Sequence, residues 1–180
     1  MKSALTALAL VALAACLDAV SSAGAHPGAL AACRSKQLLV VSSSAGAAAG
    51  TSYLSLIFIN RGARCSLVGY PGVSAVRYGA RDPVQVGPPA RREDPFSVGT
   101  GRAVVLQRNG TASSALSQVD ALNYPAARCH PEKADALRIY PPNEHTPIVV
   151  GVPVEVCRRR ATMGISPVEP GVPRALQSSG

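Results

Sequence analysis

Residues 53–60 form the most strand-like run of the chain, because β-branched and aromatic side chains follow one another there without a glycine or proline. In a strand over this run, Leu54, Leu56 and Phe58 share one face, while two isoleucines make the opposite face apolar. A strand that is apolar on both faces is typically covered on both sides. The run is therefore predicted to be a central strand of a sheet.

Breaker residues cut the rest of the chain into short runs. Arg61-Gly-Ala-Arg64 and Gly69-Tyr-Pro-Gly72 frame a second strand that opens at Cys65. Asn109-Gly110 is a hairpin signal, and the Gly/Ala-rich residues 46–50 are expected to form a connection. The other expected strands span residues 37–42, 73–76, 102–108, 115–121, 136–140 and 145–150. Weaker strand signals lie at residues 84–86, at residues 152–157, which continue the strand before them, and at residues 161–166.

About eight short strands at this spacing, with no segment of helical period, predict an all-β fold in the form of an antiparallel β-sandwich. An antiparallel β-barrel is the alternative. After removal of a leader, roughly 150 residues remain, which is the size of one domain. We expect residues 33–169 to form this domain, residues 16–32 a flexible spacer and residues 170–180 a disordered tail.

The formal net charge is +8, and most of the positive charge comes from arginine. A basic domain attracts nucleic acid, anionic lipid or acidic polymers. Basic residues cluster only at Arg91-Arg92 and Arg158-Arg159-Arg160, and no aromatic residues are interleaved with them as a nucleic-acid stacking surface requires. We therefore expect no nucleic-acid partner.

An apolar run from Ala4 to Ala15 follows Met1-Lys-Ser at the start of the chain. This run is too short to span a bilayer but suits the hydrophobic region of a signal peptide. It ends in Leu13-Ala-Ala-Cys16, which resembles a bacterial lipobox. The resemblance implies a signal peptide over residues 1–15 and a lipidated Cys16 that tethers the protein to the outer face of the membrane.

Ordinary secretion is the competing interpretation. Ala23-Gly-Ala25 fits a small-x-small cleavage site, and cleavage there would release a chain that begins at His26. The lipobox is favoured for two reasons. The hydrophobic run stops at it, and lipidation of Cys16 leaves an even number of cysteines to pair.

The chain contains five cysteines, and lipidation of Cys16 leaves an even set of four: Cys33, Cys65, Cys129 and Cys157. An exported chain meets an oxidising compartment, so these four are expected to pair. Three connectivities are possible, of which sequential pairing is the simplest. Each sequential bridge closes a loop of about thirty residues, which contributes roughly 3–4 kcal/mol in the chain-entropy model. No two cysteines have C-x-x-C spacing, so neither a zinc site nor a thioredoxin-like site is expected.

Several pieces of the chain, in this order, resemble a family of exported actinobacterial domains of unknown function that are often lipoproteins. The likeness covers roughly residues 33–168 and departs from the family at residues 108–111, where members often have a Pro-Gly turn. The matching pieces are Cys33, Tyr53–Asn60 leading to Cys65, Gly69-Tyr-Pro-Gly-Val-Ser74, Asp120-Ala-Leu-Asn-Tyr-Pro125, Cys129, Leu137-Arg-Ile-Tyr-Pro-Pro142 and Cys157.

The resemblance implies an immunoglobulin-like sandwich with two disulfides paired in sequence order, Cys33–Cys65 and Cys129–Cys157. It implies no catalytic residues. A shared fold does not by itself assign a function.

Catalytic signatures are missing from the sequence, which has no G-x-S-x-G, H-E-x-x-H, P-loop or G-x-G-x-x-G motif. We therefore predict that the protein is not an enzyme and uses neither a metal nor another cofactor. The alternative is an envelope enzyme or metal-handling protein in which His130 and His145 come together as ligands or as an acid–base pair.

Tyr70 and Tyr124 each precede a proline in a turn between strands. Tyrosines at loop tips can form a binding surface, and they can equally pack over the end of a sandwich. Asp120 is expected to cap the turn before Tyr124 through its side chain. The sequence thus predicts an exported, lipid-anchored binding or interaction module of the cell envelope, with an envelope protein or polymer as its partner.

Overall fold

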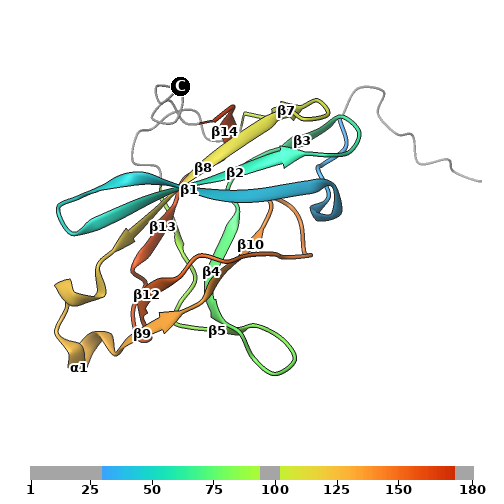
Figure 1. Cartoon of the computed structure of the whole chain (residues 1–180). Coiled ribbons are helices and arrows are strands. Elements are labelled where there is room, and N and C mark those ends of the chain that lie inside the picture. Colours follow the sequence, from blue (N-terminus) through green and yellow to red (C-terminus); the bar gives the residue numbers. More distant parts are fainter. Residues whose placement is uncertain (1–29, 94–101, 173–180) are drawn as a thin grey trace, which may run out of the picture.

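The computed structural model describes residues 30–93 and 102–172, which form layers of β-strands (Figure 1). Three short helices also occur in this part of the chain: η1 (Ser35–Gln37), η2 (Ala121–Asn123) and α1 (Ala126–Cys129). The strands are β1 (Leu38–Ala48), β2 (Thr51–Asn60), β3 (Cys65–Leu67), β4 (Gly72–Arg77), β5 (Val84–Gln85), β6 (Arg91–Arg92), β7 (Val104–Leu106), β8 (Thr111–Val119), β9 (Pro131–Ala134), β10 (Ala136–Tyr140), β11 (Ile148–Val150), β12 (Val154–Cys157), β13 (Met163–Ile165) and β14 (Glu169–Pro170).

The larger sheet has the strand order β1-β2-β8-β13-β6, and β14 also pairs with β8. β2 lies between β1 and β8, so the prediction that residues 53–60 form a central strand is confirmed. Leu56 and Phe58 face the core and are fully buried. Burial of a large apolar side chain such as Phe58 contributes about 1.5–3 kcal/mol, which fixes the register of β2.

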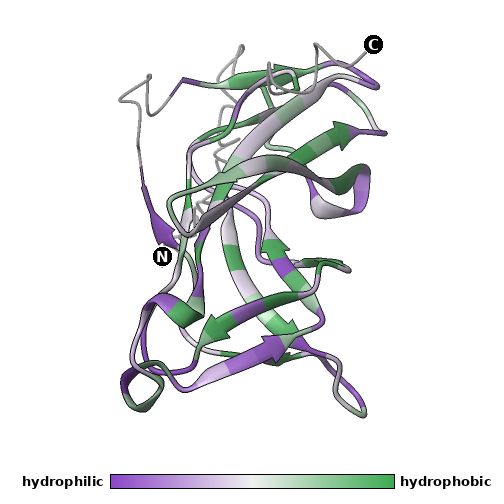
Figure 2. Cartoon of the chain, turned by 60° about the vertical axis from the view of Figure 1, so that its left-hand side comes forward, coloured by the Kyte–Doolittle hydropathy of each residue, from purple (hydrophilic) through white to green (hydrophobic). Residues whose placement is uncertain are grey.

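A four-stranded sheet, in the order β11-β10-β4-β5, forms the second layer, and strands of both layers carry hydrophobic residues (Figure 2). Leu137 and Ile139 of β10 pack into the same core as Phe58. Two further strand pairs, β3–β7 and β9–β12, complete the described structure. The sheets do not close into one barrel, so the predicted immunoglobulin-like β-sandwich is confirmed over the barrel alternative. Among the strands named above, every pair is antiparallel except β6–β13.

β1 and β2 form a longer hairpin than the sequence predicts. The sequence pattern predicts that the first strand ends at residue 42 and that residues 46–50 form a connection. The structure instead continues β1 to Ala48, with an irregularity between Ser44 and Gly46. The turn occupies Ala49 and Gly50, both with positive φ. Alanine is compatible with this strand because every residue of its outer half is exposed and needs no particular side chain to pack.

The Asn109-Gly110 turn joins two sheets and is not the tip of a hairpin. β7 before it pairs with β3, while β8 after it pairs with β2. The turn is held by Asn60, whose N–H donates to the Gly110 carbonyl (3.0 Å) and whose carbonyl accepts from the Asn109 N–H (2.6 Å). Asn109 has a φ of 63°, as the turn signal predicts, but its tertiary partner is β2.

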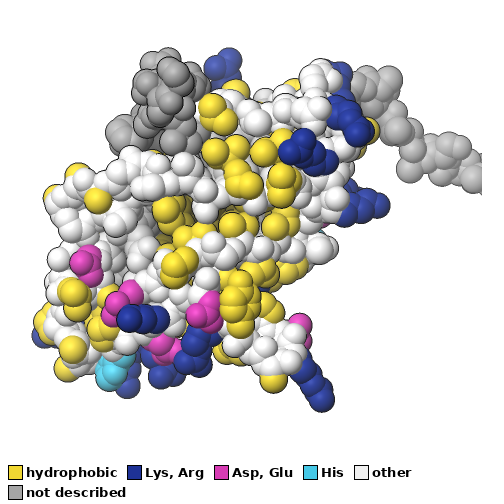
Figure 3. All heavy atoms as spheres, viewed as in Figure 1, with side chains coloured by type: hydrophobic (Ala, Val, Ile, Leu, Met, Phe, Trp, Pro, Cys, Tyr) yellow, Lys and Arg dark blue, Asp and Glu magenta, His cyan; other side chains and the backbone are white. Residues whose placement is uncertain are grey.

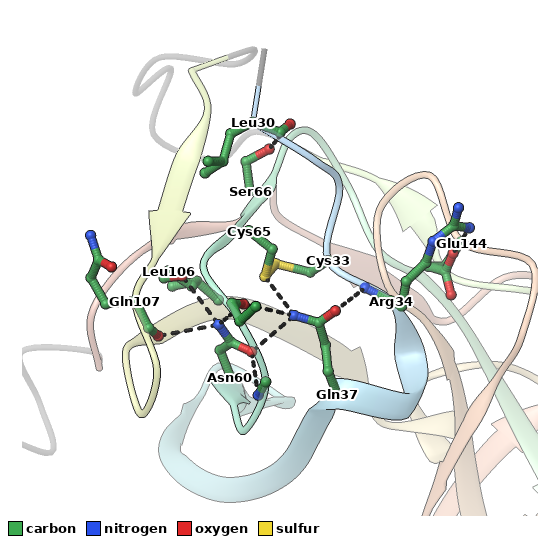
Figure 4. The surroundings of a disulfide bond; sticks show 12 residues. Leu30, Cys33, Arg34, Gln37, Asn60, Cys65, Ser66, Leu106, Gln107 and Glu144 are labelled. Carbon is green, nitrogen blue, oxygen red and sulfur yellow. Dashed lines mark hydrogen bonds and ion pairs between the residues drawn. A yellow bond between two sulfur atoms is a disulfide. The ribbon is translucent and has the colours of Figure 1, made fainter. Parts of the chain in front are cut away.

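The first disulfide joins Cys33 to Cys65 and lies over a buried polar network (Figure 4). Asn60 is fully buried, and its side-chain amide donates to the carbonyls of Ala63 and Leu106. Gln37 donates to the Asn60 side-chain oxygen (3.1 Å) and to the sulfur of Cys65 (3.2 Å). The Asn60 amide therefore has partners although it is removed from water, and the partly buried Gln37 links it to the disulfide.

The second disulfide joins Cys129, at the end of α1, to Cys157, at the end of β12. Both cysteines are fully buried and pack with Ala121 and Tyr124, while several of their chain neighbours are exposed arginines and His130. The two bridges confirm the pairing that the family resemblance implies.

The predicted signal peptide, the lipidation site Cys16 and most of the spacer and tail lie outside the described residues. Only the last residues of the expected spacer are described, and they run beside β3: the Ser66 N–H donates to the Ala31 carbonyl (2.9 Å) and Ala32 bridges Ser66. At the other end of the domain, β14 continues to Pro170.

Candidate binding groove

An open groove with a volume of about 580 Å³ runs over the outer face of the larger sheet, and we call it the outer groove. Strand register aligns four of its lining residues in one row: Tyr53 of β2 is opposite Ser117 of β8, which is opposite Gly164 of β13, which is opposite Arg91 of β6. Residues opposite one another in register lie on one face of a sheet. The row therefore turns four side-chain positions toward the same groove.

The floor of the outer groove is low because its central residues are small. Ala115, Ser117 and Gly164 line it on two adjacent strands. Above Gly164 lies the carboxylate of Glu93, which accepts a hydrogen bond from the Ser117 hydroxyl (3.2 Å). A Cβ on residue 164 would overlap this carboxylate, so glycine is what allows Glu93 to lie flat against the sheet.

One wall of the groove is a stacked pair, Tyr124 and Arg160. The Arg160 guanidinium lies 3.9 Å from the centre of the Tyr124 ring, well within the range of a cation–π interaction. Tyr124 directly follows η2, whose start is capped by the Asp120 carboxylate accepting from the Leu122 N–H (2.9 Å). The predicted capping role of Asp120 is thus confirmed.

The second disulfide holds the segment that carries Arg160. Beside it, the Arg158 N–H donates to the His130 carbonyl (3.1 Å) and the Arg159 N–H donates to the Cys129 carbonyl (3.3 Å). This turn between β12 and β13 is therefore attached to α1 by two hydrogen bonds and by the disulfide. The arrangement fixes Arg160 relative to Tyr124.

The opposite wall is β6 and the residue after it. Arg91 and Glu93 face the groove, and the Glu93 N–H donates to the Ile165 carbonyl (2.9 Å). Arg92 lies between them in the sequence and does not line the groove. Its guanidinium lies over the ring of Tyr70, 5.8 Å from the ring centre.

The outer groove holds two arginines that have no ion-pair partner in the described part of the chain, Arg91 and Arg160. Other arginines are paired: Arg34 with Glu144 (3.0 Å), and both Arg77 and Arg158 with Glu132 (3.1 Å each). Charged side chains of both signs are visible together near β9 and β12 (Figure 3). The groove thus offers two guanidinium donors, although most of the other described arginines, including Arg92 and Arg159, likewise make no ion pair.

The two tyrosines predicted as a binding surface have different surroundings. Tyr124 lines the outer groove, whereas Tyr70 does not. Tyr70 is half-buried under Arg92 and precedes the buried Pro71. Tyr70 therefore fits the packing role that was the alternative, and the structure does not bring the two rings into one surface.

His130 and His145 lie in different parts of the molecule. His130 ends α1 in a left-handed conformation and lines a small hollow with Arg158 and Arg159. His145 is an exposed residue of the β10–β11 loop, next to Glu144, which bonds to Ser35 of η1. Within residues 30–93 and 102–172, no group of three or more histidine, cysteine or acidic side chains could hold a metal ion.

Sequence reasoning missed most of the groove. The sequence pattern places Tyr53 in a strand and Arg160 in a basic cluster, and it indicates no role for Glu93. The available signal was weak: an exposed tyrosine on a strand that is otherwise apolar, and a glycine inside a strand. Neither reveals that residues 53, 93, 124 and 160 meet, because these residues belong to separate elements.

The fold and the groove define a disulfide-linked β-sandwich module, and its two disulfides indicate an oxidising, extracytoplasmic environment. Residues 33–169 match the model of the family described as "Domain of unknown function (DUF4232)", and the chain belongs to that family. No curated protein and no solved structure matches the chain. In the described residues, no helix has the length and apolar character needed to cross a membrane.

Proposed function

We propose that the protein is an exported binding module of the cell envelope, anchored through a lipid on Cys16, that holds a ligand in the outer groove and catalyses no reaction. The observation that carries this proposal is the groove itself: an aromatic–arginine wall facing a charged β6 wall across a floor of small residues. Its volume falls in the range of about 300–1,000 Å³ that is typical of ligand sites.

Rigidity supports a binding role. The groove floor consists of hydrogen-bonded strands, and one wall is attached through the Cys129–Cys157 disulfide. Side chains that are ordered before the ligand arrives lose less entropy when it binds, so a fixed wall favours affinity.

The position of the N-terminus supports anchoring from that end. The Ser66 hydroxyl donates to the Leu30 carbonyl (3.3 Å), which places the start of the described chain beside β3. β3 and α1 lie at opposite ends of the molecule (Figure 1). A chain tethered at Cys16 would therefore enter the domain beside β3, at the end opposite the groove wall next to α1.

Binding of the mature protein to cell envelope isolated from its own organism tests the binding role. We expect saturable binding that the Tyr53→Ala/Arg160→Ala variant weakens by about tenfold or more, since tyrosine and arginine dominate binding energies. The matched control is Tyr78→Ala/Arg159→Ala, which removes the same residue types outside the groove. Equal binding by both variants, or turnover of an envelope component, would contradict the proposal.

Intact mass measurement of the native protein tests the anchor. We expect the membrane fraction to contain a chain that begins at a lipid-modified Cys16 and gains about 4 Da on reduction of its two disulfides. Cys16→Ser should move the protein from the membrane to the culture medium. A native chain that begins at His26 in the medium would instead identify a freely secreted module.

A further inference from the structure

We propose that the ligand of the outer groove is an acidic glycan, a sugar chain that carries carboxylate or phosphate groups. This inference rests on the proposed binding function and assigns a chemical class to the ligand. Arg91 and Arg160 would bind the anionic groups, while the exposed ring of Tyr53 would pack against a sugar ring.

The charge of the groove argues for an anionic ligand. Both groove arginines lack an ion-pair partner in the described residues, and guanidinium groups match carboxylate and phosphate oxygens with paired N–H donors. Stacking on Tyr124 uses the face of the Arg160 guanidinium and leaves its N–H edge free to donate. The net charge of +8 attracts such a ligand from a distance.

The position of the groove argues against a peptide strand. A peptide that adds to a sheet needs unpaired backbone N–H and C=O groups at a sheet edge. The groove lies on the face of β2, β8 and β13, whose backbone groups already pair with one another. Recognition must therefore come from side chains above the sheet. The side chains that line the groove there are aromatic, hydroxyl-bearing or charged.

Glu93 determines where the anionic groups can lie. Its carboxylate occupies the space above Gly164 and accepts from Ser117, so an anionic group placed there would be repelled. A sugar hydroxyl at the same point can donate to the carboxylate. The groove thus favours a chain whose anionic groups are separated by neutral sugars rich in hydroxyl groups.

Dextran, carboxymethyl dextran and phosphorylated dextran are matched probes because they share one backbone. We expect the mature protein to bind the two acidic dextrans at least about tenfold more tightly than dextran, and to lose affinity as salt is raised, since added ions screen the charges. Stronger binding of the carboxylated or of the phosphorylated form identifies the anionic group.

Each groove arginine has an arginine next to it in the sequence that lies outside the groove and serves as its control. Arg91→Gln and Arg160→Gln should each weaken binding of the preferred acidic dextran about fivefold, the scale of one exposed charge-assisted contact. Arg92→Gln and Arg159→Gln remove the same charge from residues outside the groove and should change it less than about twofold. Circular dichroism of each variant confirms that it is folded.

Three outcomes would overturn the inference: equal affinity for acidic and neutral dextran, equal effects of all four substitutions, or tighter binding of single-stranded poly(dT) DNA with the same dependence on arginine. If envelope binding still requires Tyr53 and Arg160 in any of these cases, the binding function stands and only the ligand class is wrong. If envelope binding does not require them, the proposed function fails as well.

Discussion

The two disulfides are chemically the same cross-link, but they lie in regions of opposite character. Cys33–Cys65 lies where the described chain begins, over a buried network in which Asn60 and Gln37 bond to one another. Cys129–Cys157 packs with Ala121 and Tyr124 next to exposed charged residues, and it fixes the turn that carries Arg160. The first bridge therefore stabilises the core, whereas the second also positions a groove wall. Removing each bridge in turn separates these roles.

Loss of the first disulfide should have the largest effect on stability. For a loop of 32 residues the chain-entropy model gives about 4 kcal/mol, and disturbing the Asn60 network adds to that cost. Cys33→Ala/Cys65→Ala should therefore lower the free energy of unfolding by about 4 kcal/mol or more, measured by chemical denaturation. Envelope binding should persist at temperatures where this variant is folded. Loss of binding by a folded variant would mean that the first bridge also positions the site.

Loss of the second disulfide should cost less stability and more binding. The chain-entropy model gives nearly the same value for its loop of 28 residues, so Cys129→Ala/Cys157→Ala should lower the free energy of unfolding by about 3.5 kcal/mol, without the added cost of a disturbed Asn60 network. Freed from Cys129, the turn with Arg160 loses its fixed distance from Tyr124, and binding should weaken severalfold. Wild-type affinity in this variant, with the fold intact, would show that the wall does not need the bridge.

Sequence alone could predict the region around the first disulfide better than the outer groove beside the second disulfide. The run over residues 53–60 has both faces apolar, so its central position and its connection to Cys65 follow from local pattern. The groove does not, because β6 is only two residues long and pairs in parallel with β13, which leaves no periodic signal. Tyr70 and Tyr124 make the same point, since both precede a proline in a turn. Which ring lines the groove depends on long-range packing that sequence spacing cannot reveal.

A smaller, pH-dependent effect on stability is expected near the first disulfide, at Glu144. The Ser35 backbone N–H, which donates to the Glu144 carboxylate (2.9 Å), holds the pKa of Glu144 below its ordinary value of 4.5, and Arg34 lowers it further. A lowered pKa stabilises the folded state above the unfolded pKa, and this contribution is lost as the pH falls through the folded value.

Glu144→Gln should therefore unfold at a lower temperature than the wild type at pH 7, and the difference should shrink below about pH 4.5. Thermal unfolding followed across this range measures it. A difference that stays constant down to strongly acidic pH would show that the carboxylate charge is not what joins η1 to the β10–β11 loop.

Filling the outer groove is the most direct test of its role. Ala115 lines the groove and its side chain is exposed, so Ala115→Trp should block the groove without disturbing the core. Val105→Trp introduces the same ring on β7, at an exposed position outside the groove. With equal unfolding midpoints, Ala115→Trp should abolish saturable binding to isolated envelope, and Val105→Trp should leave it unchanged. Equal binding by both variants would contradict the assignment of the outer groove as the ligand site.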